Sequence, residues 1–304
     1  MKYIPAILLL VLFLAGIGLY ERDLSPEEAA KALTNEESKF LRIQGMDLHY
    51  RVEGEGLPLV LLHGTGSMLQ TWDDWTNALK NHFRIIRFDL PGFGLTGPNP
   101  ERDYSMRFYT SVLAELADSL SLDSFFLAGN SLGGQIAWEY AIDHPGKVKK
   151  LVLLAPAGVK SKAKSTLVFK LAKYETLSTL LQNFGTRFFV QKTLNDIYAD
   201  PSRINPDMAN LYHIAALRAG NRRAFMDRLS APLDENKVER LTELNMPVML
   251  LWGNRDVLVP HTLAPRFQKF ISNSELKIYP GAGHIPMEEI PDLSVNDVVD
   301  FLIN

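Results

Sequence analysis

Residues 124–134 read SFFLAGNSLGG and join an apolar run to the start of a helical pattern. The apolar run, residues 124–128, is predicted to be a buried strand, and residues 132–143 are predicted to be a helix. Gly129 and Gly133, two residues on either side of Ser131, allow a turn too tight for side chains, which exposes the Ser131 hydroxyl at a helix N-terminus. A plain glycine turn with a capping serine is the simpler interpretation. The strand–turn–helix context favours a serine nucleophile.

A serine hydroxyl is a poor nucleophile until a base takes its proton, and the base needs an orienting acid. Among the seven histidines, His284 lies in a glycine-rich loop directly after a predicted strand, residues 276–279. Asp256 follows another predicted strand, residues 248–252. An ordinary loop histidine and a turn-capping aspartate are the alternatives. Because all three residues follow strand ends, the sequence predicts a catalytic triad of Ser131, His284 and Asp256.

An oxyanion hole needs two backbone N–H groups aimed at the tetrahedral intermediate. One is predicted to come from Leu132, directly after the nucleophile. The other is predicted to come from the loop after the apolar run 57–62, which reads HGTG. Thr65 is the expected donor because glycines on both sides let its backbone turn inward, and Gly64 is the second choice. His63 is expected to shape this loop rather than to exchange protons.

Short apolar runs alternate with longer helical patterns from residue 40 onward, which predicts an α/β fold with a mostly parallel sheet. Several runs are apolar on both faces, as in strands buried between two helical layers. The first two strands are expected to pair in antiparallel fashion. Predicted strands cover residues 40–44, 47–52, 57–62, 84–88, 124–128, 148–154, 248–252 and 276–279. Predicted helices cover residues 72–79, 105–120, 132–143, 262–270 and 293–302.

The alternation breaks between residues 159 and 244, where the pattern is largely helical. An insertion at the carboxyl ends of parallel strands lies over the ligand crevice. The sequence therefore predicts a helical lid between the sixth and seventh strands.

The composition describes an ordinary globular protein and excludes several classes. Of 304 residues, 46% are hydrophobic and 22% are charged, with a formal net charge of −3. No overall basic excess is present to neutralise phosphates, so no nucleic-acid partner is expected. Cysteine is absent, which excludes disulfides and a cysteine nucleophile. No paired histidines appear at helical spacing, and no metal site is expected.

Five segments together resemble the α/β-hydrolase superfamily: residues 63–66, 89–94, 129–134, 252–256 and 281–284. The order of the predicted triad, serine then acid then histidine, is also that of the superfamily. The resemblance covers roughly residues 40 to 304 except most of the insertion. It implies an eight-stranded sheet, a lid inserted between strands 6 and 7, and no cofactor.

Carboxylic ester hydrolysis is the first functional prediction. Epoxide hydrolases and haloalkane dehalogenases of the superfamily use an aspartate where this chain has Ser131. Its serine-dependent members mostly cleave esters, so the resemblance implies a serine esterase or lipase for a small, apolar or lipid-like ester. Such an enzyme works through an acyl-enzyme on the serine, with the histidine shuttling protons.

Two alternatives stay open. Residues 129–134 also resemble the elbow of carbon–carbon bond hydrolases that act on ring-cleavage products, with Asn130 at the same place. Those enzymes need cationic groups in the lid for a dienoate carboxylate, and the insertion offers Arg187, Arg218, Arg222 and Arg223. Solvated arginines are the commoner case. A non-enzymatic protein that binds a ligand in the same pocket is the other alternative.

The N-terminus carries a predicted membrane segment. Lys2 is followed by an uncharged run over residues 3–20. A helix of this length reaches roughly 27 Å, just enough to cross a hydrocarbon core. We expect a single anchor over residues 1–20 with the catalytic domain on the exported side, and a cleaved signal with secretion is the alternative. Residues 21–38 are expected to be a stalk or short solvated helix, and residues 39–304 the hydrolase domain.

A lysine-rich stretch could add contact with lipid. Eight lysines and no acidic residue lie between residues 147 and 173. Polybasic segments attract anionic lipid at about 1 kcal/mol per charge. The stretch is predicted to hold the lid mouth against a membrane, and a solvated lysine face is the alternative.

Overall fold

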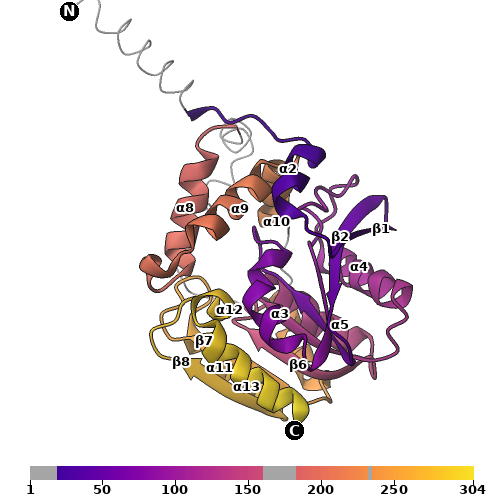
Figure 1. Ribbon diagram of the computed structural model, residues 1–304. Coiled ribbons are helices and arrows are strands. Elements are labelled where there is room, and N and C mark those ends of the chain that lie inside the picture. Colours follow the sequence, from indigo (N-terminus) through magenta and orange to yellow (C-terminus); the bar gives the residue numbers. More distant parts are fainter. Residues whose placement is uncertain (1–18, 160–182, 232–234) are drawn as a thin grey trace, which may run out of the picture.

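One eight-stranded sheet forms the centre of the computed structural model, which describes residues 19–159, 183–231 and 235–304 (Figure 1). The strand order is β1-β2-β4-β3-β5-β6-β7-β8, with antiparallel pairing of β2 to both β1 and β4 and parallel pairing elsewhere. The predicted α/β fold and its antiparallel start are therefore confirmed. The strands are β1 (Ser38–Ile43), β2 (Met46–Glu53), β3 (Leu57–Leu62), β4 (Phe83–Phe88), β5 (Phe125–Asn130), β6 (Val148–Leu154), β7 (Val248–Gly253) and β8 (Ser274–Tyr279).

Alternate side chains of each central strand enter two separate cores. On β3, Val60 and Leu62 pack into the core under α4 (Met106–Ser119), α5 (Leu132–Asp143) and α11 (Ala264–Phe270). Leu59 and Leu61 pack into the opposite core, under α3 (Asp73–Leu79) and α13 (Pro291–Ile303). Because both faces are covered, a central strand must be apolar throughout, and each buried leucine contributes about 1.5–3 kcal/mol.

The predicted helices agree with the observed ones except at their ends. The helix predicted over residues 132–143 is α5 without change. The pattern over residues 72–79 forms α3, preceded by the 3₁₀ turn η1 (Leu69–Trp72). Another 3₁₀ turn, η4 (His261–Leu263), precedes α11, and the short α12 (Pro286–Glu289) precedes α13.

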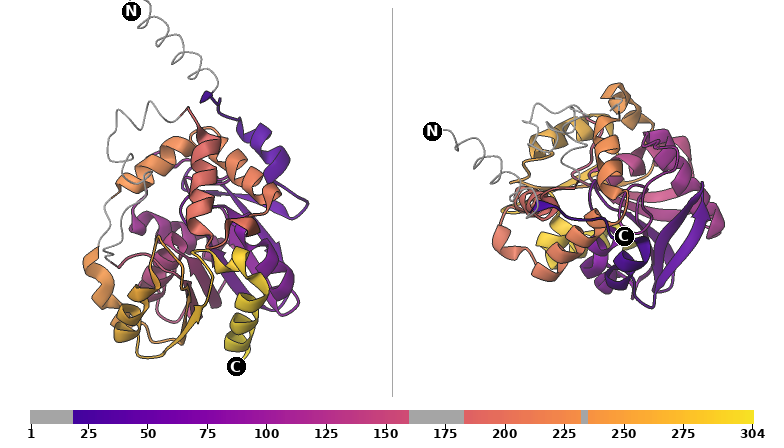
Figure 2. Two further views of the ribbon diagram at one scale, coloured as in Figure 1. Left: turned by 90° about the vertical axis from the view of Figure 1, so that its left-hand side faces the viewer. Right: turned by 90° about the horizontal axis from the view of Figure 1, so that it is seen from above.

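The described part of the stretch between β6 and β7 is mostly helical. It contains α8 (Thr186–Ile197), η2 (Pro201–Arg203), α9 (Pro206–Leu217), α10 (Asn221–Ser230) and η3 (Glu235–Glu243). Helices α8, α9 and α10 lie together at one end of the sheet (Figures 1 and 2). We call residues 159–244 the insertion.

Residues 19–24, here called the N-terminal strap, lie along the insertion. The N–H of Leu24 donates to the carbonyl of Leu217 at 2.8 Å, and the N–H of Ala219 donates to Leu24 at 2.8 Å. The strap leads into α2 (Pro26–Leu33), whose Ala29 and Leu33 are fully buried. The segment predicted as a stalk or short solvated helix thus contains a short helix, and that helix packs on the domain. The packing was not predicted because only two apolar residues of α2 are buried and because the partners of the strap lie far away in the chain.

The predicted anchor lies almost wholly in residues 1–18, outside the described part. Among the residues that the structure does describe, no helix is long and apolar enough to cross a membrane. The five lysines of the lysine-rich stretch that lie between residues 160 and 173 also fall outside the described ranges. Of the earlier ones, Lys147 lies 3.7 Å from an Asp118 carboxylate oxygen and Lys150 donates to the Phe301 carbonyl at 2.8 Å. These two lysines are thus engaged by the domain itself.

Arg222 ties the strap to the insertion. Its side chain is only 9% exposed, and the guanidinium donates to Asp23 at 2.5 Å, to the Glu21 carbonyl at 2.9 Å and to the Thr186 hydroxyl at 2.9 Å. Beside it, the Glu21 carboxylate pairs with His213. Burial raises the pKa of Glu21, but the Arg187 N–H and His213 outweigh it and hold that pKa below its usual value.

We expect Arg222→Met to lower the free energy of unfolding by about 2 kcal/mol, because charged hydrogen bonds on a largely buried group contribute about 1.5–3 kcal/mol. Arg42→Met is the matched control. Arg42 pairs with Asp47, and both side chains are more than 60% exposed. Exposed pairs contribute about 0–1 kcal/mol. Urea denaturation of the two variants measures the difference, and equal losses would show that the Arg222 contacts do not stabilise the chain.

Candidate active site

Ser131 occupies the turn between β5 and α5 in a strained conformation. Its φ of 54° and ψ of −113° lie in a region that side chains rarely adopt. Such a conformation costs on the order of 1–3 kcal/mol and persists only where the surroundings enforce it. Here the Ser131 N–H donates to Leu154 at 2.9 Å, and its carbonyl accepts from Gln135 at 3.0 Å and Ala157 at 2.9 Å. The serine is thus held at the N-terminus of α5 by three backbone contacts.

The two glycines that flank the serine permit this turn. A Cβ on Gly129 would lie 2.3 Å from the Gly133 carbonyl oxygen, and a Cβ on Gly133 would lie 2.2 Å from the Leu62 carbonyl oxygen. Both distances are far inside van der Waals contact. Helix α5 therefore approaches β3 and β5 as closely as it does only because these positions lack side chains.

His284 and Asp256 form a buried pair. The Nδ1 atom of His284 lies 2.6 Å from Oδ2 of Asp256. The other oxygen of Asp256 accepts from the N–H groups of Leu258 at 2.8 Å and Val259 at 2.9 Å. A carboxylate at Nδ1 favours the tautomer with its proton there, which leaves Nε2 able to accept a proton. The two residues thus have the arrangement that a general base and its orienting acid need.

Asn130 links the serine turn to the histidine loop. Its Nδ2 donates to the His284 carbonyl at 3.0 Å and to the Leu154 carbonyl at 3.2 Å. The side chain is buried. Because it is the residue before Ser131, this amide fixes the loop of the base relative to the nucleophile. Sequence analysis treated Asn130 only as a point of resemblance, and the contact that gives it this role is visible only in three dimensions.

The histidine loop is also held from the insertion. The His284 N–H donates to the Ile197 carbonyl at 2.7 Å, at the end of α8. The Glu289 carboxylate accepts from the N–H groups of Gly283 at 2.6 Å and Asp200 at 2.9 Å. The sequence signal for Glu289 is the acidic pair shortly after His284, which sequence reasoning did not single out.

The predicted oxyanion loop lies directly against the serine. A Cβ on Gly64 would be 3.3 Å from the Cβ of Ser131. The N–H of Leu132 belongs to the first turn of α5, where N–H groups have no acceptor within the helix. Thr65 follows Gly64 in this loop. The choice of Leu132 and Thr65 as the two donors stays a prediction.

The His63 side chain supports the oxyanion loop through both of its ring nitrogens. Its Nδ1 donates to the Gly64 carbonyl at 2.8 Å, and its Nε2 accepts from the Leu90 N–H at 2.9 Å. Burial lowers the pKa of His63, although the nearby Asp89 acts in the opposite direction. A neutral ring with both nitrogens engaged is suited to support and not to proton transfer, as the sequence analysis expects.

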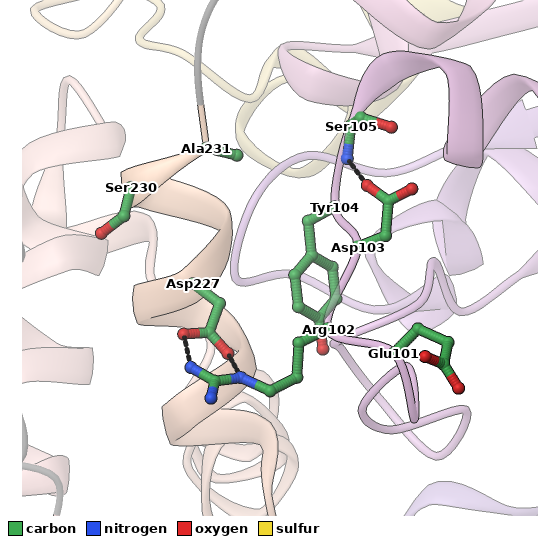
Figure 3. A pocket seen from close by; sticks show the side chains of 8 residues that line it. All are labelled: Glu101, Arg102, Asp103, Tyr104, Ser105, Asp227, Ser230 and Ala231. Carbon is green, nitrogen blue, oxygen red and sulfur yellow. Dashed lines mark hydrogen bonds and ion pairs between the residues drawn. The ribbon is translucent and has the colours of Figure 1, made fainter.

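A hollow of about 480 Å³ opens between α10 and the loop before α4 (Figure 3). Its carboxylates serve the fold: Asp227 accepts from Arg102 at 2.7 Å, and Asp103 accepts from the Ser105 N–H at 2.8 Å. None of the predicted triad residues lines it. The lining residues are Glu101, Arg102, Asp103, Tyr104, Ser105, Asp227, Ser230 and Ala231.

Comparison with known proteins agrees with this architecture. The model of the family described as alpha/beta hydrolase fold matches residues 58–291. The chain belongs to that family. It is 27% identical over 252 residues to a 2-hydroxy-6-oxo-2,4-heptadienoate hydrolase of Pseudomonas putida, covering 79% of this chain and 87% of the relative.

A second Pseudomonas putida protein is also similar. It is a 2-hydroxy-6-oxononadienedioate/2-hydroxy-6-oxononatrienedioate hydrolase, 29% identical over 289 residues that cover 89% of this chain and 99% of the relative. Among solved structures, a membrane phospholipase A superposes with a TM-score of 0.73 at 24% identity, covering 99% of this chain and 92% of the other. That last likeness concerns the fold alone.

Proposed function

We propose that this chain is a serine hydrolase in which Ser131 attacks a carbonyl carbon and forms an acyl-enzyme. His284 accepts the Ser131 proton and passes it to the leaving group, Asp256 stabilises the imidazolium, and the N–H groups of Leu132 and Thr65 stabilise the oxyanion. Water then releases the acyl group. The strained Ser131 turn supports the proposal best, because strained conformations cluster at active sites and this one exposes the nucleophile at a helix N-terminus.

The names of the relatives favour carbon–carbon bond cleavage over the ester hydrolysis that the sequence first predicts. A 2-hydroxy-6-oxodienoate contains a ketone flanked by carbon on both sides, so its hydrolysis must break a carbon–carbon bond. The same acyl-enzyme chemistry applies, with a carbanion-stabilising dienoate as leaving group. The first substrate class that we propose is therefore a keto acid of this type.

Carboxylic ester hydrolysis is the second candidate, and two of the four predicted arginines of the insertion favour it. A dienoate carboxylate needs a cation in the pocket. Arg222 is already paired with Asp23 of the strap, and Arg223 lies 3.0 Å from an Asp227 oxygen. A neutral ester needs no such cation.

The two classes are separated by assaying the full-length chain in detergent on both kinds of substrate. Loss of dienoate absorbance is measured with 2-hydroxy-6-oxodienoates, and nitrophenolate release is measured with p-nitrophenyl esters of increasing chain length. A larger kcat/KM on the dienoates supports the first class, and a larger value on the esters supports the second. If the folded protein hydrolyses neither kind of substrate, the proposed enzymatic function is rejected in favour of ligand binding.

We also propose that the insertion acts as a lid and that residues 1–20 anchor the chain in a membrane, with the hydrolase domain on the exported side. The uncharged run of residues 3–20 supports the anchor. Alkaline carbonate extraction of membranes tests it. Retention of the full-length chain in the pellet supports the anchor, and release of a shortened chain supports a cleaved signal.

A further inference from the structure

The hydroxyl of Tyr212 lies between the insertion and the oxyanion loop. Tyr212 belongs to α9, and its ring is buried. Its hydroxyl oxygen is 2.6 Å from Oε1 of Glu288 and 3.0 Å from the hydroxyl of Ser67. Ser67 closes the loop of residues 63–67, and its N–H donates to the Gly64 carbonyl at 3.3 Å. One hydroxyl thus touches both a carboxylate and the loop that lies against Ser131.

The Glu288 carboxylate accepts hydrogen bonds from three hydroxyl groups that lie far apart in the chain. Besides Tyr212, its carboxylate accepts from the hydroxyl of Tyr198 at 2.7 Å and from that of Thr71. Burial holds the pKa of Glu288 above its usual value, and the neighbouring Asp74 acts in the same direction, although the three hydroxyl donors lower that pKa in part. Hydrogen bonds to an ionised carboxylate are stronger than those between neutral groups, so the three hydroxyls are assigned as donors and Glu288 as their acceptor.

The direction of the hydrogen bonds follows from the number of protons. A hydroxyl has one proton to donate. Tyr212 gives its proton to Glu288, so its oxygen accepts from Ser67. The chain of hydrogen bonds therefore runs from the oxyanion loop through Tyr212 to Glu288, which lies four residues after His284.

We propose that Tyr212 is a positioning residue of the oxyanion hole. Its hydroxyl, oriented by Glu288, holds Ser67 and with it the loop that carries Gly64 and Thr65 beside Ser131. Because Tyr212 belongs to the insertion, the oxyanion hole is complete only when α9 is docked. This inference rests on the proposed serine hydrolase, but it does not depend on which substrate class is correct.

The test compares two variants that each remove one hydroxyl from the same carboxylate. Tyr212→Phe removes the link to Ser67. Tyr198→Phe removes a donor to Glu288 whose hydroxyl makes no hydrogen bond to the oxyanion loop among the described residues, and it is the matched control. Both retain the ring, so losses of packing are small.

Phosphonylation of Ser131 by a fluorophosphonate probe is the readout, since the probe reacts through the oxyanion hole and needs no knowledge of the substrate. We expect Tyr212→Phe to lower the maximal labelling rate about tenfold, less than the 10²–10³ lost with a whole donor, with the probe concentration at half-maximal rate changed less than about twofold. Tyr198→Phe should label within about twofold of the parent. A merely structural role would affect both variants alike.

A double-mutant cycle with Ser67→Ala strengthens the test. If Tyr212 acts through Ser67, the double variant should label no more slowly than the slower single variant. Additive losses, or a parent-like rate for Tyr212→Phe, would overturn the inference. Absence of labelling in the parent would instead reject the proposed hydrolase, so the two failures are distinguishable.

Discussion

Ser131→Ala is expected to lower kcat by about 10⁴- to 10⁶-fold on whichever carbonyl substrate the parent hydrolyses. Removing the nucleophile of a serine–histidine–acid triad abolishes the covalent route, and the remaining rate comes from the oxyanion hole and substrate binding. The measurement is kcat and kcat/KM of the full-length variant beside the parent. Retention of more than about one part in a hundred of the parent rate would exclude Ser131 as the nucleophile.

The stability of the same variant serves as its control. The Ser131 side chain makes no capping hydrogen bond to α5, so the alanine variant should unfold within about 0.5 kcal/mol of the parent. Ser131→Gly should be more stable than the alanine variant by about 1 kcal/mol or more, because glycine adopts a φ of 54° without strain. A glycine variant that is less stable than the alanine variant would contradict the strain that we infer.

Gly133→Ala is expected to lower the free energy of unfolding by at least about 3 kcal/mol. The added Cβ would lie 2.2 Å from the Leu62 carbonyl oxygen and 2.6 Å from that of His63. Both atoms are backbone, so relief requires α5 to move away from β3. That movement opens the core and displaces Ser131 from the oxyanion loop, and overpacking of this kind lies at the severe end of single substitutions. Thermal unfolding and soluble yield measure the effect.

Gly146→Ala is the matched control for that substitution. Gly146 has a φ of +86°, and a Cβ there would meet nothing within 4 Å. Only the backbone strain remains, which costs on the order of 1–2 kcal/mol. For a domain of this size each kcal/mol shifts Tm by about 2–4 °C. A Gly133→Ala variant that melts no lower than Gly146→Ala would show that the elbow tolerates a side chain.

Sequence periodicity predicts the sheet well because the central strands are covered on both faces. Runs such as residues 57–62 and 148–154 must be apolar throughout, and their predicted bounds equal those of β3 and β6. Residues 21–38 were predicted to be a stalk or short solvated helix, and the short helix is observed as α2, but its packing on the domain was not predicted. Residues 19–24 bind the insertion through backbone hydrogen bonds and through the side chains of Glu21 and Asp23, whose partners His213 and Arg222 lie 192 and 199 positions away in the chain. No local pattern predicts partners at such a separation.

Some residues of the candidate site could likewise be selected from the sequence, and others could not. Ser131, Asp256 and His284 could be selected from the sequence because each follows a predicted strand, and parallel strands bring their carboxyl ends to one edge of the sheet. The pairing of His284 with Asp256 is visible in the structure. Asn130, Glu289 and Tyr212 could not be selected, because their importance depends on a partner far away in the chain.

The sequence alone determined that this protein is an α/β hydrolase with a serine at the elbow, because glycine spacing and strand burial are local constraints that residue types record directly. Only the tertiary structure decided that the strap lies on the insertion and that Tyr212 joins Ser67 to Glu288. Tyr212 lies 145 positions after Ser67 and 76 positions before Glu288 in the chain. No local pattern encodes such contacts, since they depend on where the sheet places each loop relative to the others.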